Sequence, residues 1–311
     1  MRIGYLSLTT RCPNRCIACP CVNNNATFGE LSVDEVKRAV ELADQHGGAD
    51  QFILSGGEPT LHTRFLEIMG YLATKSFSVS LTTTSQRFAD RDFLNKLLDV
   101  YPVERLKAAT SLHSFDPLVH DRMTNTEGSF YAWYTGLRQA GSAGIAITLK
   151  HLISKPTHQA IPSFVQCYYE QFEEQVPLLI CGLDFSGKAA RHKEAVFVPF
   201  HESRPYLEEA LSLVAKRKSE GDDRKVTVFD VPYCAVGSEF WPYLYTTADD
   251  DRHLVVYHAP DVPEGKPLTR VPQRSGVTSA GCVRCKVRGK CSGAWGSAFD
   301  VVGEDSLVPV E

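Results

Sequence analysis

The chain has 311 residues, of which 43% are hydrophobic and 23% are charged, and its formal net charge at pH 7 is -4. This length allows one large domain or two ordinary ones with a sizeable buried core, and the residue balance excludes global disorder. No stretch approaches the roughly 18 to 20 uninterrupted apolar residues of a membrane span, and the acidic balance gives no general attraction for nucleic acid.

Strands and helices alternate in the predicted order from residue 3 to about residue 230. Predicted strands cover 3–8, 51–54, 77–81, 106–112, 145–152, 177–181 and 226–229. The first predicted helix opens at Ser32, which forms a capping box with Glu35, and others lie around 65–72, 93–97, 130–137, 164–172 and 203–217. This alternation predicts parallel strands with right-handed crossovers, in an α/β barrel that has too few units for complete eightfold closure.

The last part of the chain differs in character from the rest. From about residue 231 it is rich in turn-forming and charged residues, with few helical patterns. We therefore predict a boundary near residue 230, with the barrel in residues 1–230 and a smaller module in residues 231–311.

Cysteine usage is the unusual feature of the composition. The amino terminus has no cleavable apolar segment behind it, which favours a cytoplasmic location, where clustered thiols bind metal or do chemistry more often than they form disulfides. The ten cysteines are Cys12, Cys16, Cys19 and Cys21 near one end, Cys282, Cys285 and Cys291 near the other, and Cys167, Cys181 and Cys234 between them.

The first cysteine group has the spacing C-x3-C-x2-C, from Cys12 through Cys16 to Cys19, in the loop after the first strand. Three thiolates on a short loop can hold three corners of a cubane iron-sulfur cluster. The fourth iron then keeps an open position for substrate or cofactor, as catalytic zinc sites do. A zinc knuckle and unrelated thiols are the alternatives that the spacing leaves open.

The second strand runs directly into Gly56-Gly57-Glu58-Pro59. A glycine pair at the carboxyl end of a parallel strand lies on the face where barrel enzymes assemble their sites. Its exposed main-chain groups can bind a small zwitterion, and an ordinary tight turn is the alternative.

Together with Ser111-Leu-His-Ser-Phe-Asp116 and Gly128-Ser-Phe130, these two motifs resemble the radical S-adenosylmethionine (SAM) superfamily. The resemblance implies a partial (β/α)6 TIM-like barrel whose [4Fe-4S] cluster, on Cys12, Cys16 and Cys19, binds SAM at the open iron. One electron then cleaves SAM into methionine and a 5'-deoxyadenosyl radical, which abstracts a substrate hydrogen atom. The protein positions the cofactor and excludes water.

The same resemblance assigns cofactor contacts by position. Gly56, Gly57 and Glu58 are expected to hold the methionine end of SAM, and Ser111 the ribose. Lys150 on the fifth strand is a candidate for the cofactor carboxylate, with a solvent-facing lysine as the alternative. The chain departs from common family patterns by having Ala18 where an aromatic residue often precedes the third cysteine, and His113 where an aspartate is frequent.

The second cysteine group has the pattern C-x2-C-x5-C-x-G and resembles the tail of the twitch and SPASM subgroup. Cys234 matches the upstream ligand of that pattern, so Cys234, Cys282, Cys285 and Cys291 are expected to hold an auxiliary [4Fe-4S] cluster. Four-cysteine zinc is the alternative. Because only about 20 residues follow Cys291, we expect a small twitch-type iron-sulfur module rather than a full SPASM domain.

Three cysteines fall outside these patterns. Cys181 ends the sixth strand, where it would face the barrel mouth and its thiol could donate a hydrogen atom to a substrate radical, with simple packing as the alternative. Cys167 is expected to be a small buried hydrophobe, and Cys21 to neighbour the first cluster without ligating it.

The chain looks most like the maturases of His-Xaa-Ser peptide systems. We therefore expect oxidative modification of a ribosomal peptide, with the auxiliary cluster accepting an electron and a flavodoxin or ferredoxin-type protein as reductant. No nucleic acid or membrane partner is expected. Because the chain begins directly at the first strand, the peptide would be recognised by the barrel or by a partner. The alternatives are a small-molecule dehydrogenase of a sugar or aminocyclitol alcohol, and a non-catalytic iron-sulfur or zinc protein.

Overall fold

The structure is a computed structural model. It describes residues 2–20, 29–45, 47–172, 176–185, 187–245, 253–256, 280–291, 293, 307 and 310. None of the helices among these residues is long and apolar enough to cross a membrane.

One parallel sheet organises the described residues, with its strands in the order β8-β7-β6-β5-β4-β3-β2-β1-β9. The strands are β1 (Arg2–Thr9), β2 (Gln51–Gly56), β3 (Ser78–Thr83), β4 (Leu106–Ser111), β5 (Ala146–Leu152), β6 (Leu178–Cys181), β7 (Val226–Phe229), β8 (Leu244–Tyr245) and β9 (His253–Val256). Each strand from β1 to β7 therefore lies beside the next one along the chain. The predicted α/β partial barrel is confirmed.

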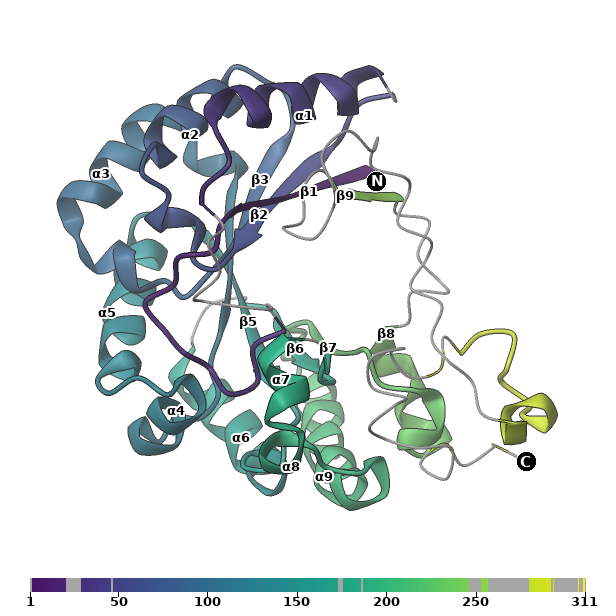
Figure 1. Ribbon diagram of the computed structural model, residues 1–311. Coiled ribbons are helices and arrows are strands. Elements are labelled where there is room, and N and C mark those ends of the chain that lie inside the picture. The colour runs from purple at the N-terminus through teal and green to yellow at the C-terminus, as the bar shows by residue number, and fades with distance from the viewer. Residues whose placement is uncertain are drawn as a thin grey trace.

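Most of the helices cover the convex side of the curved sheet, as Figure 1 shows, whereas the two short helices after β6 pack near the loop that follows β1. The helices are α1 (Val33–Gln45), α2 (Phe65–Ala73), α3 (Arg91–Val100), α4 (Pro117–Thr124), α5 (Ser129–Ser142), α6 (Ile161–Gln171), α7 (Gly187–Arg191), α8 (Lys193–Val196) and α9 (Phe200–Ser219). Two short 3-10 helices, η1 (Pro59–Leu61) and η2 (Gln86–Ala89), follow β2 and β3.

Local sequence signals explain where the helices begin. The backbone N-H of Ser32 donates to Glu35 Oε2 at 2.7 Å, and Glu35 N donates to Ser32 Oγ at 3.2 Å, so the predicted capping box opens α1. Helix α4 was not predicted, although Asp116 caps it by accepting from Leu118 N at 2.8 Å and Pro117 occupies its first turn.

The two last strands fall after the predicted boundary near residue 230. β8 extends the sheet beyond β7, and β9 pairs in parallel with β1, with Arg2 opposite His253. Among the described residues these two edge strands do not pair with each other, so the barrel is open between them. The assignment of residues 231–311 to a separate module remains a prediction.

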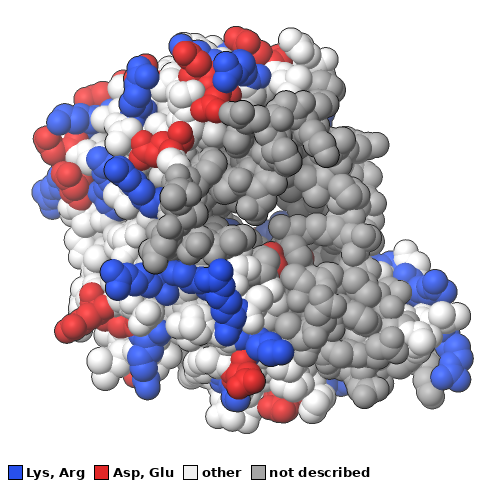
Figure 2. Space-filling model, viewed as in Figure 1, with Lys and Arg blue, Asp and Glu red and all other residues white. Residues whose placement is uncertain are grey.

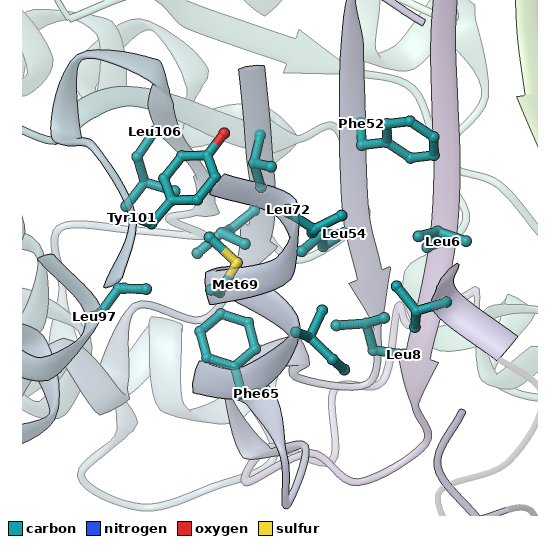
Figure 3. Close-up of a cluster of buried hydrophobic side chains, with 14 of the residues drawn as sticks. Leu6, Leu8, Phe52, Leu54, Phe65, Met69, Leu72, Leu97, Tyr101 and Leu106 are labelled. Carbon is teal, nitrogen blue, oxygen red and sulfur yellow. The ribbon is translucent and has the colours of Figure 1, made fainter. Parts of the chain in front are cut away.

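Alternation along each strand separates an apolar outer face from a more polar inner one. Leu6 and Leu8 of β1, with Phe52 and Leu54 of β2, are buried in the cluster that α2 completes (Figure 3). Because successive strand residues point to opposite faces, the intervening residues face the concave side. This inner face carries Ser7, Ser55, Ser80, Thr82, Ser111, Thr148 and Lys150. Hydroxyl groups and an amine on the concave side are suited to contact a polar ligand.

Candidate active site

The loop after β1, residues 10–20 (the cysteine loop), is fixed by neighbouring elements at several points. Ile17 N donates to Met123 O of α4 at 3.0 Å, and Ala189 N of α7 donates to Cys19 O at 3.1 Å. The Gln86 amide of η2 donates to the buried Asn14 side chain at 2.9 Å. Anchors from three different elements hold the cysteines at the carboxyl ends of the strands.

The glycine turn packs directly against the cysteine loop. Gly57 N donates to Thr9 O at 2.6 Å, and Glu58 N donates to Arg11 O at 2.7 Å. A Cβ on Gly56 would lie 2.3 Å from Thr9 O, and one on Gly57 would lie 2.2 Å from Arg11 O. The glycines are therefore required for contact between two protein segments. This differs from the expectation that their main chain is left exposed for a ligand, because both N-H groups after Gly56 are bonded within the chain.

The carboxylate of Glu58 is also used inside the protein. Its side chain is only 1% exposed. Oε1 accepts from Thr60 N at 3.1 Å, Thr60 Oγ1 at 2.6 Å and Thr83 Oγ1 at 2.8 Å, and Oε2 accepts from Thr84 N at 2.5 Å. The carboxylate thus caps η1 and ties the end of β2 to the end of β3. These partners of Glu58, Thr60, Thr83 and Thr84, were not predicted from the sequence, although the run of threonines at the end of β3 was a visible signal.

The thiols of the cysteine loop are half-buried and close enough to influence one another. Burial raises the pKa of Cys12 to about 12, and the Glu58 carboxylate and the Cys19 thiol add to the rise. Burial, then Cys19 and Cys12, raises the pKa of Cys16 to about 12. Lys188 opposes both shifts. These thiols are therefore neutral until positive charge, such as that of bound iron, compensates the thiolates.

The donor set of the cysteine loop fits an iron-sulfur cluster. Cysteine thiolates are the usual protein ligands of such a cluster, and three of them on one anchored loop would hold three irons and leave the fourth open. In the described part of the chain, no group of three or more His, Cys, Asp or Glu side chains is already arranged as a metal site. Cys21 lies outside the described residues.

Ser111, Lys150 and Cys181 share the inner face of the sheet. Ser111 ends β4 directly beside Lys150 of β5, and the next inward position of β5, Leu152, pairs with Cys181 of β6. Burial lowers the pKa of Lys150, while the nearby Cys181 opposes that shift. Among the described residues, the Lys150 ammonium has no hydrogen-bond or ion-pair partner. Burial raises the pKa of Cys181 to about 12, against the influence of Lys150.

Three buried histidines (the histidine trio) lie between the sheet and the helices. They are His113 after β4, His120 of α4 and His151 of β5. His113 N donates to His120 Nδ1 at 3.4 Å, and His151 Nδ1 donates to Leu112 O at 3.1 Å. Burial lowers the pKa of His113 to about 3 and those of His120 and His151 to about 4. The trio is therefore neutral at pH 7, and its members are too far apart in the sequence to be recognised there as a group.

The second cysteine group forms compact turns near the outer core. Cys285 N donates to Cys282 O at 3.1 Å, while the sulfurs of Cys285 and Cys291 accept from Val310 N at 3.4 Å and Gly293 N at 3.3 Å. Cys291 packs against the same hydrophobic cluster as the two residues that flank Cys234. Both segments therefore contribute to the same hydrophobic cluster.

Ala18, which stands where the family often has an aromatic residue, is buried with Met123, Leu183 and Phe185. Cys167 is half-exposed on α6 rather than buried, so the packing prediction for it was wrong.

The family comparison matches the part of the chain that carries this site. The model for the Radical SAM superfamily matches residues 6–157. Residues 6–157 form a radical SAM domain. The segment includes the cysteine loop, the glycine turn, Ser111 and Lys150. The cofactors of a radical SAM domain are a [4Fe-4S] cluster and SAM, which confirms these two expected cofactors, while the auxiliary cluster stays a prediction.

Two curated relatives are similar to this chain at low identity. Fe-coproporphyrin III synthase of Methanosarcina barkeri is 25% identical over 242 residues, which cover 77% of this chain and 56% of that protein. A "Probable GTP 3',8-cyclase" of Thermococcus kodakarensis is 32% identical over 124 residues, which cover 40% of this chain and 38% of that protein. The chain thus spans little more than half of one relative's length and less than half of the other's.

Solved structures with the same fold extend beyond the radical SAM domain. Streptococcus suis SuiB bound to the precursor peptide SuiA gives a TM-score of 0.67 at 12% identity, covering 99% of this chain and 74% of SuiB. Native anSMEcpe with bound AdoMet and Cp18Cys peptide gives a TM-score of 0.69 at 13% identity, covering 99% and 92%. At these identities the likeness concerns the fold.

Proposed function

We propose that this chain is a radical SAM enzyme that oxidatively modifies a ribosomal peptide. The observation that carries the proposal is the placement of Ser111, Lys150 and Cys181 on one polar inner face, at the strand ends where the anchored cysteine loop lies. The fold is shared over 99% of the chain with two proteins whose structures hold peptides, which supports a peptide substrate.

The residues that would hold the cofactors follow from their placement. Cys12, Cys16 and Cys19 would ligate the cluster, and the Lys150 ammonium would bind the SAM carboxylate, because a half-buried cation without a partner among the described residues favours an anion. Ser111 beside it would contact the ribose. When bound, the cluster supplies one electron that cleaves SAM and yields the radical that takes a hydrogen atom from the substrate.

The glycine turn supports this arrangement in an indirect way. Gly56 and Gly57 would hold the methionine end only through groups that the cysteine loop leaves available, since Gly57 N and Glu58 N already bond to that loop. Glu58 would act by fixing the turn. The exclusion of water from the site depends on this packing.

Cys181 is the candidate catalytic residue of the inner face. Its raised pKa keeps it as a neutral thiol at pH 7, and the thiol, rather than the thiolate, is the form that can donate a hydrogen atom.

Cys234, Cys282, Cys285 and Cys291 would hold the auxiliary [4Fe-4S] cluster that accepts the substrate electron. Backbone N-H groups that donate to the sulfurs of Cys285 and Cys291 support this assignment, because hydrogen bonds to cysteine sulfur stabilise thiolate ligands and tune cluster potentials. Iron analysis of the Cys12→Ala/Cys16→Ala/Cys19→Ala variant tests it. About four irons per chain should survive that triple change, and zinc in their place would refute the assignment.

Anaerobic reconstitution followed by reduction with dithionite in the presence of SAM tests the activity. We expect 5'-deoxyadenosine from the wild type and from a Cys167→Ala control, and none from the triple cysteine variant. The reduced cluster should also give an electron paramagnetic resonance signal that the triple variant lacks at this site. If the wild type binds four irons at the cysteine loop but yields no 5'-deoxyadenosine, the catalytic proposal fails.

A small-molecule substrate is the second candidate, because the two curated relatives are named for a coproporphyrin and a GTP reaction. A deuterated short peptide encoded beside the gene discriminates the two. Transfer of deuterium from the peptide into 5'-deoxyadenosine supports the peptide proposal. Deuterium transfer only from a deuterated sugar or aminocyclitol alcohol supports the alternative.

A further inference from the structure

Lys and Arg side chains gather in a band across the face shown in Figure 2. Arg15 lies in the cysteine loop and Arg122 in the last turn of α4, while two short helices supply the rest. We define the basic band as Arg15, Arg122, Lys188, Arg191 and Lys193. All are exposed except Lys188, which is half-buried.

Backbone contacts place these residues beside the thiols. Arg15 N donates to Thr124 O at 2.9 Å, which joins the loop to the end of α4. Ala189 N donates to Cys19 O at 3.1 Å, which brings α7 to the other end of the loop. Lys188 lies near enough to Cys12 and Cys16 to act on both thiols. The elements that carry the band therefore contact the cysteine loop on both sides.

The charges of the basic band are not compensated within the described residues. None of its members forms an ion pair there, whereas Arg64, Lys96, Arg204 and other surface cations are paired with carboxylates. Glu194 is the exposed acidic residue next to the band in the sequence. In a chain with 37 acidic and 33 basic residues, five cations without an ion pair among the described residues, carried by elements that meet at one loop, are suited to an anionic partner.

We propose that the basic band docks an acidic electron-carrier protein of the flavodoxin or ferredoxin type. This inference rests on the proposed function, because it requires a cluster at the cysteine loop. In the transfer the carrier loses one electron and the cluster gains it, and no bond forms or breaks. Complementary charge would steer the carrier to the basic band, whose elements contact the cysteine loop. A small, polar and transient interface is typical of such encounters.

A charge-reversal variant tests the docking surface. Arg122→Glu/Arg191→Glu/Lys193→Glu leaves the cysteine loop itself unchanged. The matched control reverses three exposed cations elsewhere, in Arg38→Glu/Arg138→Glu/Lys218→Glu, with the same change in net charge. The readout is the dissociation constant of reconstituted protein for a purified flavodoxin with negative net charge. We expect the band variant to bind at least about tenfold more weakly and the control to stay within about twofold of wild type.

Two further measurements sharpen the test. Raising NaCl from about 25 to about 250 mM shortens the Debye length from roughly 20 to 6 Å, which should weaken wild-type binding and remove most of the difference between variants. The ratio of 5'-deoxyadenosine formed with reduced flavodoxin to that formed with dithionite should fall in the band variant alone. The corresponding Arg→Gln and Lys→Gln variant should fall between wild type and the reversal.

The outcomes separate this proposal from the one on which it rests. Equal flavodoxin binding by wild type and band variant overturns the docking surface, even if the enzyme is active with dithionite. Loss of affinity for heparin but not for flavodoxin also overturns it, since the band would then serve a polyanion. A wild type that makes no 5'-deoxyadenosine with dithionite overturns the proposed function instead, whatever the binding data show.

Discussion

The side chain of Glu58 provides a direct test of how the glycine turn works. In the Glu58→Gln variant, the amide can keep its oxygen at the position that accepts from Thr60 and Thr83. Its NH2 group then faces the backbone N-H of Thr84, which now donates to Oε2 at 2.5 Å. One charge-assisted hydrogen bond is lost and a buried donor is left without an acceptor. That change costs about 1.5–3 kcal/mol.

The expected result is a lower melting temperature with little change in cofactor binding. At roughly 2 °C per kcal/mol for a chain of this size, the loss corresponds to a decrease of about 3–6 °C. Circular dichroism of the metal-free protein measures it, and Glu41→Gln on the exposed face of α1 serves as the charge-matched control. The dissociation constant of reconstituted Glu58→Gln protein for SAM should stay within about threefold of wild type.

The opposite result would refute the reasoning. If Glu58→Gln melts within about 1 °C of wild type but binds SAM at least about tenfold more weakly, the carboxylate contacts the cofactor and does not serve as the internal acceptor described above.

Three other predictions concern the surroundings of the site. Gly57→Ala places a Cβ 2.2 Å from the carbonyl oxygen of Arg11 and should reduce the iron retained by the cysteine loop. The control Gly70→Ala, whose Cβ meets nothing within 4 Å, should retain that iron and raise the free energy of unfolding by about 0.5–1 kcal/mol. Equal iron contents in the two variants would contradict this prediction. The histidine trio has folded-state pKa values below the ordinary 6.5, so unfolded chains bind these protons first as pH falls. The free energy of unfolding should therefore fall by about 3–4 kcal/mol as the pH is lowered from 7.5 to 5.5. An unchanged urea midpoint over this range would exclude a neutral trio. Lys150→Met should keep or raise the melting temperature of the metal-free protein, because a half-buried amine without a partner among the described residues is costly. The same change should weaken SAM binding at least about tenfold. An unchanged affinity for SAM in calorimetry would show that Lys150 does not bind the carboxylate.

The order of the strands was predictable because the chain forms the barrel from successive strand–helix units. Apolar alternation located the strand at 226–229 at the bounds that the structure has, and the capping box located the start of α1. Each of these signals depends on residues within one turn or one strand, so tertiary contacts did not change them.

Contacts between distant segments were not predictable in the same way. The bond from Gly57 N to Thr9 O joins the turn after β2 to the end of β1, and nothing local in a Gly-Gly pair indicates that its partner is another backbone segment. β9 was missed because its four residues lie in a turn-rich region whose strand pairs with β1, at the opposite end of the sequence. For the site, the cysteine spacing indicated the ligand set, while burial of Ala18 and of the histidine trio depends on packing.

The pairing of β1 with β9 also affects the order in which this molecule can be assembled. β1 leads into the cysteine loop, yet its outer edge is covered by residues 253–256, about 250 positions later. During synthesis that edge offers unpaired N-H and C=O groups to any other chain until the late strand emerges from the ribosome. A nascent chain stopped before residue 253 should therefore be prone to aggregate at the very strand that leads to the iron-binding loop.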